Sequence, residues 1–199
     1  MRTSFRPIVA SVLALAVVVA GAAAQEVTTR PWGFGVAVGA TVPVGDLGDF
    51  AGLGFHVKGS VHWERATMPI GFRGELEYAD LGGKTVNIGT TALDGPDTRI
   101  LSLGANVLWA FRQAEVVDAD EGRSRGFPYA IAGIGVYDFD YSDSGIPGSG
   151  GGTTDFGLNA GAGWRFGIAG LRMNAEARFH YVFSDEPTNF IPFSLGIMF

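Results

Sequence analysis

Large apolar side chains alternate with small or polar ones along most of the chain. Eight segments show this alternation, and turn-rich stretches separate them. A period of two residues predicts β-strands that carry one apolar and one polar face. The expected strands are residues 33–42, 55–64, 72–78, 101–111, 128–141, 156–166, 171–183 and 191–199.

The phase of the alternation is ambiguous in residues 128–141, whereas the other seven segments each have one consistent phase. We choose the phase that puts Asp138 and Asp140 on the polar face. This choice assigns four residues to the apolar face: Tyr129, Ile131, Tyr137 and Phe139.

The lengths of these segments suit strands that cross a membrane at a tilt, which need about 9–11 residues. Lipid offers no partner for free backbone N–H and C=O groups, so a spanning sheet must close on itself. An even number of strands also allows every neighbour to run antiparallel. The chain is therefore expected to be all-β, as an eight-stranded antiparallel up-and-down transmembrane β-barrel.

The connectors between the segments support this topology. Short turns at one rim and long loops at the other are typical of outer-membrane barrels. The short connectors are 66–69 and 167–170, and the long ones are 44–53, 81–98 and 142–154. Two connectors depart from the rule, because 112–126 is long on the short side and 184–189 is short on the long side.

The tryptophans give an independent check on this arrangement. They fall at the start of the first expected strand and at the ends of the second, fourth and sixth, so all four reach the short-turn side. Aromatic residues gather where a membrane meets water. We therefore expect an aromatic girdle of Trp32, Trp63, Trp109 and Trp164.

The first 24 residues have the pattern of a secretory signal peptide. Arg2 and Arg6 precede an apolar run of 13 residues, and three alanines at 22–24 form a small-residue cleavage site. We expect removal of 1–24, which leaves 25–199 as one barrel domain. The chain has no Cys, which suits an exported protein and excludes a disulfide scaffold.

Composition narrows the function classes further. Hydrophobic residues make up 47% of the chain and charged residues 17%. Beyond the N-terminus, however, there is no run of about 18 apolar residues, so a helical membrane protein is excluded. A net charge of −6 without a basic patch argues against a nucleic-acid partner.

Three stretches carry a resemblance to a known family: residues 39–46 (GATVPVGD), 128–135 (PYAIAGIG) and 195–199 (LGIMF). With them the whole chain after the signal resembles the small eight-stranded outer-membrane β-barrel proteins, a family that includes the OmpA-like and OmpX-like barrels. The resemblance implies a monomer in the cell outer membrane of Gram-negative-type bacteria, among outer-membrane lipids and lipopolysaccharide. Phe199, with apolar residues at alternate positions before it, is similar to the signal read by the barrel assembly machinery, the expected partner during biogenesis. Activity is not implied, because this fold carries many functions.

The inward faces of the expected barrel carry many charged residues. Eight strands leave an interior just wide enough for side chains, and an unpaired buried ion is strongly disfavoured. We expect an ionic plug of Lys58, Arg73, Glu75, Glu77, Glu176, Arg178 and His180. Further inward charges are Glu64, Arg165 and Arg172, with His56 and His62. A turn at 66–67 places Lys58 near Glu75 and His56 near Glu77.

Signals for catalysis, cofactors or metals are few. Outer-membrane lipid A deacylases place a His and a Ser two residues apart on one strand, but here Val182 follows His180 at that distance, and Ser184 is two residues further on. We therefore expect no enzymatic activity and no cofactor. Four acids gather near the third long loop: Asp138, Asp140, Asp143 and Asp155. Asp143 stands where a calcium loop requires Gly, so a solvated rim is the ordinary interpretation, and Ca²⁺ or Mg²⁺ bridging to lipid A is the alternative.

These observations favour a barrel that supports the membrane or contacts other surfaces through its loops. Three alternatives stay open at this point. The inward charges could gate a narrow channel, or the barrel could modify lipids. A soluble barrel for apolar ligands would need the opposite polarity, with its charged residues facing solvent.

Overall fold

The computed structural model of the chain describes residues 31–65, 68–88, 91–94, 97–111, 117–118, 123–141, 151–184 and 188–199. The expected signal peptide lies outside these residues.

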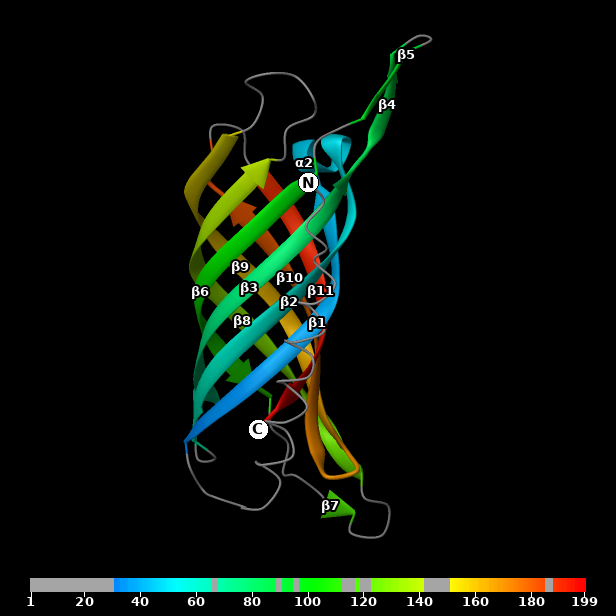
Figure 1. Cartoon of the computed structure of the whole chain (residues 1–199). Helices are drawn as coiled ribbons and strands as arrows, with labels where there is room; N and C mark the ends of the chain where they lie inside the picture. Colours follow the sequence, from blue (N-terminus) through cyan, green and yellow to red (C-terminus); the bar gives the residue numbers. More distant parts are fainter. Residues whose placement is uncertain are drawn as a thin grey trace. The chain divides into compact units, whose positions relative to one another are not determined.

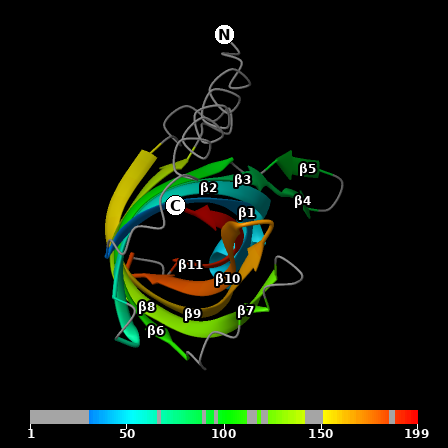
Figure 2. The same ribbon diagram turned by 90° about the horizontal axis from the view of Figure 1, so that it is seen from below.

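Eight antiparallel strands form a closed barrel (Figures 1 and 2). Each strand pairs with its neighbours along the chain, and the first pairs with the last to close the ring. The prediction of an eight-stranded antiparallel up-and-down barrel is confirmed. The barrel strands are β1 Trp32–Val44, β2 Ala51–Glu64, β3 Ile70–Gly83, β6 Thr98–Ala110, β8 Arg123–Tyr141, β9 Gly151–Ile168, β10 Leu171–Val182 and β11 Thr188–Met198.

The stagger of the strands fixes the width of the barrel and the neighbours across it. Following paired residues once around the ring leads from Gly33 on β1 back to Pro43 on the same strand, a stagger of ten residues. The path is Gly33, His62, Arg73, Asn106, Gly133, Asn159, His180, Phe190 and Pro43. Such a stagger tilts the strands by roughly 40° and leaves a lumen that side chains can fill.

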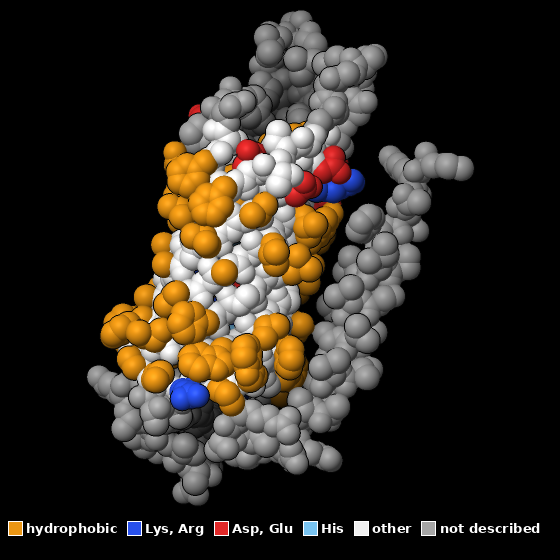
Figure 3. Space-filling view, turned by 90° about the vertical axis from the view of Figure 1, so that its left-hand side faces the viewer, with side chains coloured by type: hydrophobic (Ala, Val, Ile, Leu, Met, Phe, Trp, Pro, Cys, Tyr) orange, Lys and Arg blue, Asp and Glu red, His pale blue; other side chains and the backbone are white. Residues whose placement is uncertain are grey.

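The outer surface is apolar and the lumen is polar, as alternation in seven of the eight segments predicted. Phe34 and Leu103 point outward and are 61% and 64% exposed, whereas Lys58 and Arg73 point inward and are each 3% exposed. Figure 3 shows the apolar side chains spread over the outside of the barrel. This polarity contradicts the soluble ligand-binding barrel.

The chosen phase of residues 128–141 is wrong. Ile134 and Val136 face outward, while the lumen holds the four residues assigned to the apolar face: Tyr129, Ile131, Tyr137 and Phe139. The tyrosines face inward because their hydroxyl groups find hydrogen-bonding partners there. Asp138 and Asp140 face outward at the end of β8, where a strand leaves the apolar belt.

Several connectors contain structure that the pattern did not predict. Helix α2 (Asp46–Phe50) joins β1 to β2, and a hairpin of β4 (Thr85–Ile88) and β5 (Thr91–Asp94) joins β3 to β6 (Figure 1). At the other end, β7 (Val117–Asp118) pairs with the start of β8. Within the described residues, no helix is long and apolar enough to cross a membrane.

Two barrel strands start five residues earlier than expected. β8 begins five residues before 128, and β9 begins five residues before 156. The ladders continue beyond the apolar belt, where neither face has to meet lipid. Residues 151–155, with the sequence GGTTD, therefore lack the large alternating side chains that reveal a strand in the sequence.

The two ends of the barrel differ, and we name them by their connectors. The short-turn rim holds the β2–β3 and β9–β10 turns, the latter a tight turn in which Ala169 and Gly170 have positive φ. The long-loop rim holds α2 and the β4–β5 hairpin. All four tryptophans lie at the short-turn rim, where Trp32 and Trp63 are paired across neighbouring strands.

A pair of glycine variants tests the close approach of β1 to β11. A Cβ atom on Gly39 would lie 1.8 Å from the carbonyl oxygen of Phe193, whereas a Cβ on the outward-facing Gly59 would meet nothing within 4 Å. Gly39→Ala should lower the free energy of unfolding by about 2 kcal/mol or prevent closure. Gly59→Ala, the matched control, should change it little. Urea unfolding in detergent micelles measures both, and equal stability of the two variants would contradict the packing described here.

Candidate functional site

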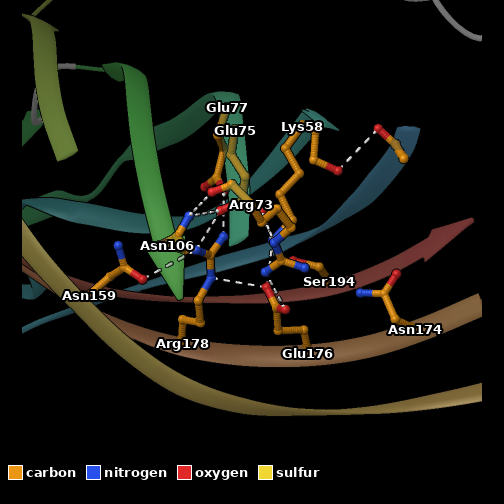
Figure 4. Close-up of polar contacts among 12 residues, drawn as sticks. Lys58, Arg73, Glu75, Glu77, Asn106, Asn159, Asn174, Glu176, Arg178 and Ser194 are labelled. Atoms are coloured by element: carbon orange, nitrogen blue, oxygen red, sulfur yellow. Dashed lines mark hydrogen bonds and ion pairs between the residues drawn. The ribbon is translucent and has the colours of Figure 1, made fainter. Parts of the chain in front are cut away.

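The centre of the lumen contains six charged side chains that contact one another, which we call the ionic core. Three are cations and three are anions, so the group is neutral when all are ionised. Each residue is at most 6% exposed. Its members come from β2, β3 and β10, and Figure 4 shows most of them pointing toward a common centre: Lys58, Arg73, Glu75, Glu77, Glu176 and Arg178.

Glu176 is the hub of the ionic core. Its carboxylate accepts hydrogen bonds from Lys58 Nζ at 2.9 Å and from Arg73 Nη2 at 2.6 Å. Arg178 Nε lies 3.0 Å away, and the hydroxyl of Tyr129 donates a bond of 2.5 Å. Three hydrogen-bond donors and the guanidinium of Arg178 thus surround one buried carboxylate, which offsets the cost of removing it from water.

Glu75 is a second acceptor on the opposite wall. Arg178 Nη1 donates to it at 2.6 Å, Asn106 Nδ2 donates at 2.7 Å, and Arg73 Nε lies 3.0 Å away. Glu77 is held less tightly, with Arg178 Nη2 at 3.8 Å. Arg73 and Arg178 each contact both Glu75 and Glu176, so the two arginines join the walls across the lumen.

Glycines on the neighbouring strand β9 make room for the side chains of Arg178 and Tyr129. A Cβ atom on Gly161 would lie 2.7 Å from Arg178 Cγ, and one on Gly163 would lie 2.3 Å from the ring of Tyr129. The many inward glycines of the sequence are therefore consistent with a packing role.

One of the two ion contacts expected from the sequence is present. Lys58 Nζ lies 3.8 Å from Glu75, as expected. The other expectation is wrong, because His56 pairs with Ala79 and bonds with Thr41 and Ser194 instead of Glu77. The β2–β3 ladder is shifted by two residues relative to the assumed turn.

His180 lies outside the ionic core, on its long-loop side. Its Nδ1 atom is 2.9 Å from the hydroxyl of Tyr137, and its ring stacks on Phe190 with centroids 4.7 Å apart. With His56, it forms a layer of hydrogen bonds above the ions. The sequence placed His180 in the lumen but not in this aromatic setting.

Four polar residues of the lumen network were missing from the expected plug: Tyr129, Asn106, Asn159 and Asn174. Asn159 accepts from Arg178, and Asn174 donates to Tyr129. Their signal in the sequence was a polar or hydroxyl-bearing residue on an inward face. The wrong phase of 128–141 concealed Tyr129.

The short-turn end of the lumen is occupied by an ion pair between Glu64 and Arg165. Both terminal nitrogens of the guanidinium donate to the two carboxylate oxygens. The guanidinium also lies over the ring of Tyr129, 5.1 Å from its centroid. This bidentate geometry holds the pair at the short-turn mouth of the lumen, below the ionic core, where both side chains stay partly exposed.

The long-loop end is closed by apolar side chains, which we call the apolar cap. These come from α2 and from the ends of the strands at the long-loop rim: Leu47, Ala51, Ala79, Leu81, Ile100, Tyr137, Phe139, Val182 and Phe190. None is more than 8% exposed.

Little empty space is left between these layers. One cavity of about 10 Å³ lies beside Lys58, Ser60, His62 and Glu75. That is about the space needed by a single water molecule. The side chains of the Glu64–Arg165 pair, the ionic core and the apolar cap thus occupy successive levels of the described lumen.

The three acidic residues of the expected rim that the structure describes do not converge on one point. Asp138 faces outward and accepts a hydrogen bond from Thr154, and Asp140 faces outward 3.9 Å from Arg99. Asp155 lies on the inward-facing side of β9, and Asp143 is outside the described residues. No group of three or more residues suited to a metal ion occurs among those that the structure describes.

The described features define a class of protein: a transmembrane barrel with an apolar outside, a girdle of tryptophans and a filled polar lumen. The chain belongs to the family of outer membrane protein β-barrel domains, whose model matches residues 10–199. Membership of this family implies a location in an outer membrane. No curated protein matches the chain in sequence.

Solved structures of outer-membrane barrels are similar in fold. Neisserial surface protein A has a TM-score of 0.55 at 16% identity, over 84% of this chain and 94% of that one. OprG from Pseudomonas aeruginosa has a TM-score of 0.50 at 11% identity, over 85% and 97%. A major outer membrane protein from Thermus thermophilus has a TM-score of 0.50 at 14% identity, over 85% and 99%. At these identities the likeness concerns the fold alone.

Removing one carboxylate from the ionic core tests which of them is the hub. Glu176→Gln leaves three cations with one fewer counter-charge at close range and should lower the free energy of unfolding by roughly 3 kcal/mol. Glu77→Gln, the matched control, should cost clearly less because the guanidinium of Arg178 lies 3.8 Å from its carboxylate. Tryptophan fluorescence during urea unfolding in lipid vesicles measures both. Equal losses would contradict the central position of Glu176.

Proposed function

We propose that this protein is a monomeric, non-catalytic barrel that supports the outer membrane and contacts other surfaces through its long-loop rim. The observation that carries this proposal is the filled lumen. A chain that fills its interior with an ion pair, an ionic core and an apolar cap leaves only its outside and its rims for interaction.

The outer surface supports a close fit to lipid. Phe156 and Phe183 stack at the long-loop rim with centroids 6.2 Å apart, and Tyr181 packs edge-on against Phe183. These aromatics face the tryptophan girdle across the apolar belt. Outer-membrane lipids and lipopolysaccharide are thus the proposed partners along the wall.

The absence of catalysis is part of the proposal, and the placement of the histidines supports it. His56, His62 and His180 all point into the lumen and are at most 6% exposed. A lipid substrate in the membrane approaches the outer wall, where these imidazoles cannot reach it. Lipid A and phospholipid profiles of cells that produce the chain should therefore match those of cells that do not.

The proposed role is tested in cells that lack the protein. The envelope of such cells should leak more in the presence of detergent. Expression of the intact chain should bring the leakage back to its normal level. A variant in which the β4–β5 hairpin is replaced by a short turn should also bring the leakage back to its normal level. It should no longer contact other surfaces through the long-loop rim. Failure of the intact chain to change either property would refute the proposal.

The second candidate function is a narrow gated channel. The observation that favours it is the ion network across the lumen. Purified protein in planar lipid bilayers should show no discrete conductance steps, because the buried side chains of the ionic core and the apolar cap occupy the lumen. A general porin in the same bilayers is the positive control. Reproducible steps from the unmodified chain would favour the channel.

We also propose that the C-terminal pattern is read by the barrel assembly machinery. Phe199→Ala should reduce the amount of folded barrel in the membrane fraction of cells, seen as a loss of the heat-modifiable band on gels. The same variant should refold from urea into detergent as well as the parent chain does. A parallel loss in both settings would mean that Phe199 acts on stability and not on recognition.

A further inference from the structure

The lumen is closed twice, by layers that differ in chemistry. The ionic core consists of charged side chains from β2, β3 and β10. The apolar cap lies nearer the long-loop rim and consists of aliphatic and aromatic side chains. A layer of hydrogen bonds, formed by His56, His180 and their partners, lies between the two.

One member of the apolar cap does not come from the barrel wall. Leu47 belongs to α2, a helix of five residues between β1 and β2. It is 8% exposed, whereas Asp46 and Asp49 on the same helix are exposed. Leu47 is thus the side chain by which α2 enters the mouth of the lumen.

The connection of α2 to the barrel does not involve the ionic core. The residue before it, Gly45, has a φ of 62°, a conformation that glycine adopts without strain. Within α2, the carbonyl oxygen of Gly48 accepts a hydrogen bond from the exposed Lys84. The ion pairs of the ionic core join strand residues alone, so a displacement of α2 leaves them in place.

We propose that the lumen is closed by two seals in series that open independently: the ionic core, and a lid in which α2 holds Leu47 over the long-loop mouth. Displacement of the lid exposes a cup with apolar walls and a floor formed by the histidine layer. Passage through the barrel requires the ionic core to open as well. Neither event alone makes a pore.

The chain has no Cys, so a single introduced thiol reports on each seal without background. Ser102 is the best position, because it lies on the inward face of β6 and pairs with Glu77 of the ionic core and Tyr137 of the cap. Ser102→Cys in the parent chain should react slowly with a charged, water-soluble thiol reagent. Adding Leu47→Asp should raise the rate at least about tenfold, because the rate follows the open fraction of the lid. Asp49→Ala, an exposed change on the same helix, is the matched control and should leave the rate unchanged.

Conductance in planar bilayers tests whether the seals act in series. Leu47→Asp alone and the pair Glu176→Ala with Arg178→Ala should each stay closed, and the triple variant should conduct. Heat-modifiable migration on gels confirms that every variant has folded. The pair Glu75→Ala with Arg73→Ala replaces the first core pair if that pair does not fold.

Three results would each overturn the proposal. The first is fast labelling of Ser102→Cys in the parent chain, and the second is slow labelling that persists when Leu47→Asp is added. The third is conduction by a folded core variant in which Leu47 is intact. The proposed support role does not depend on these results, because it concerns the unmodified chain.

Discussion

The hydrocarbon core of a membrane contains no water, and the rest of this structure depends on that constraint. Every backbone N–H and C=O group in a spanning strand needs a partner within the sheet, and the pairing of β1 with β11 supplies the last row. Once the sheet is closed, each side chain faces either lipid or a lumen of fixed width. The outside must be apolar and the inside must be filled, which inverts the usual relation between burial and polarity.

A polar filling has a consequence for the sequence as well as for the fold. If both faces of the strands were apolar, each segment would become a continuous hydrophobic run of the kind found in helical membrane proteins. Charged lumen residues preserve the alternation, but each buried ion then needs a counter-charge. Glu176, with three cations and a hydroxyl around it, shows how the chain meets that need within a lumen of eight strands.

The filled lumen limits what the protein can do with its interior. Ionic contacts lie in the middle of the lumen, and apolar contacts lie at its long-loop mouth, where α2 contributes Leu47. The side chains that meet lipid and the connectors at the long-loop rim are the surfaces left for partners. For this reason the proposed function assigns support to the wall and recognition to the loops.

The sequence by itself determined the number of strands, the closure of the sheet, the outward face of seven segments and the rim that holds the tryptophans. All of these follow from a local property, the contact of every second side chain with lipid. The phase of β8, the partner of His56 and the strand extensions at 123–127 and 151–155 were decided only by the tertiary structure. Register depends on the conformation of the turns, and contacts across the lumen depend on the stagger summed over all eight strands. Neither quantity is encoded in the periodicity of a single segment, so the hydrogen bond from Tyr129 to Glu176 could not be predicted from the sequence.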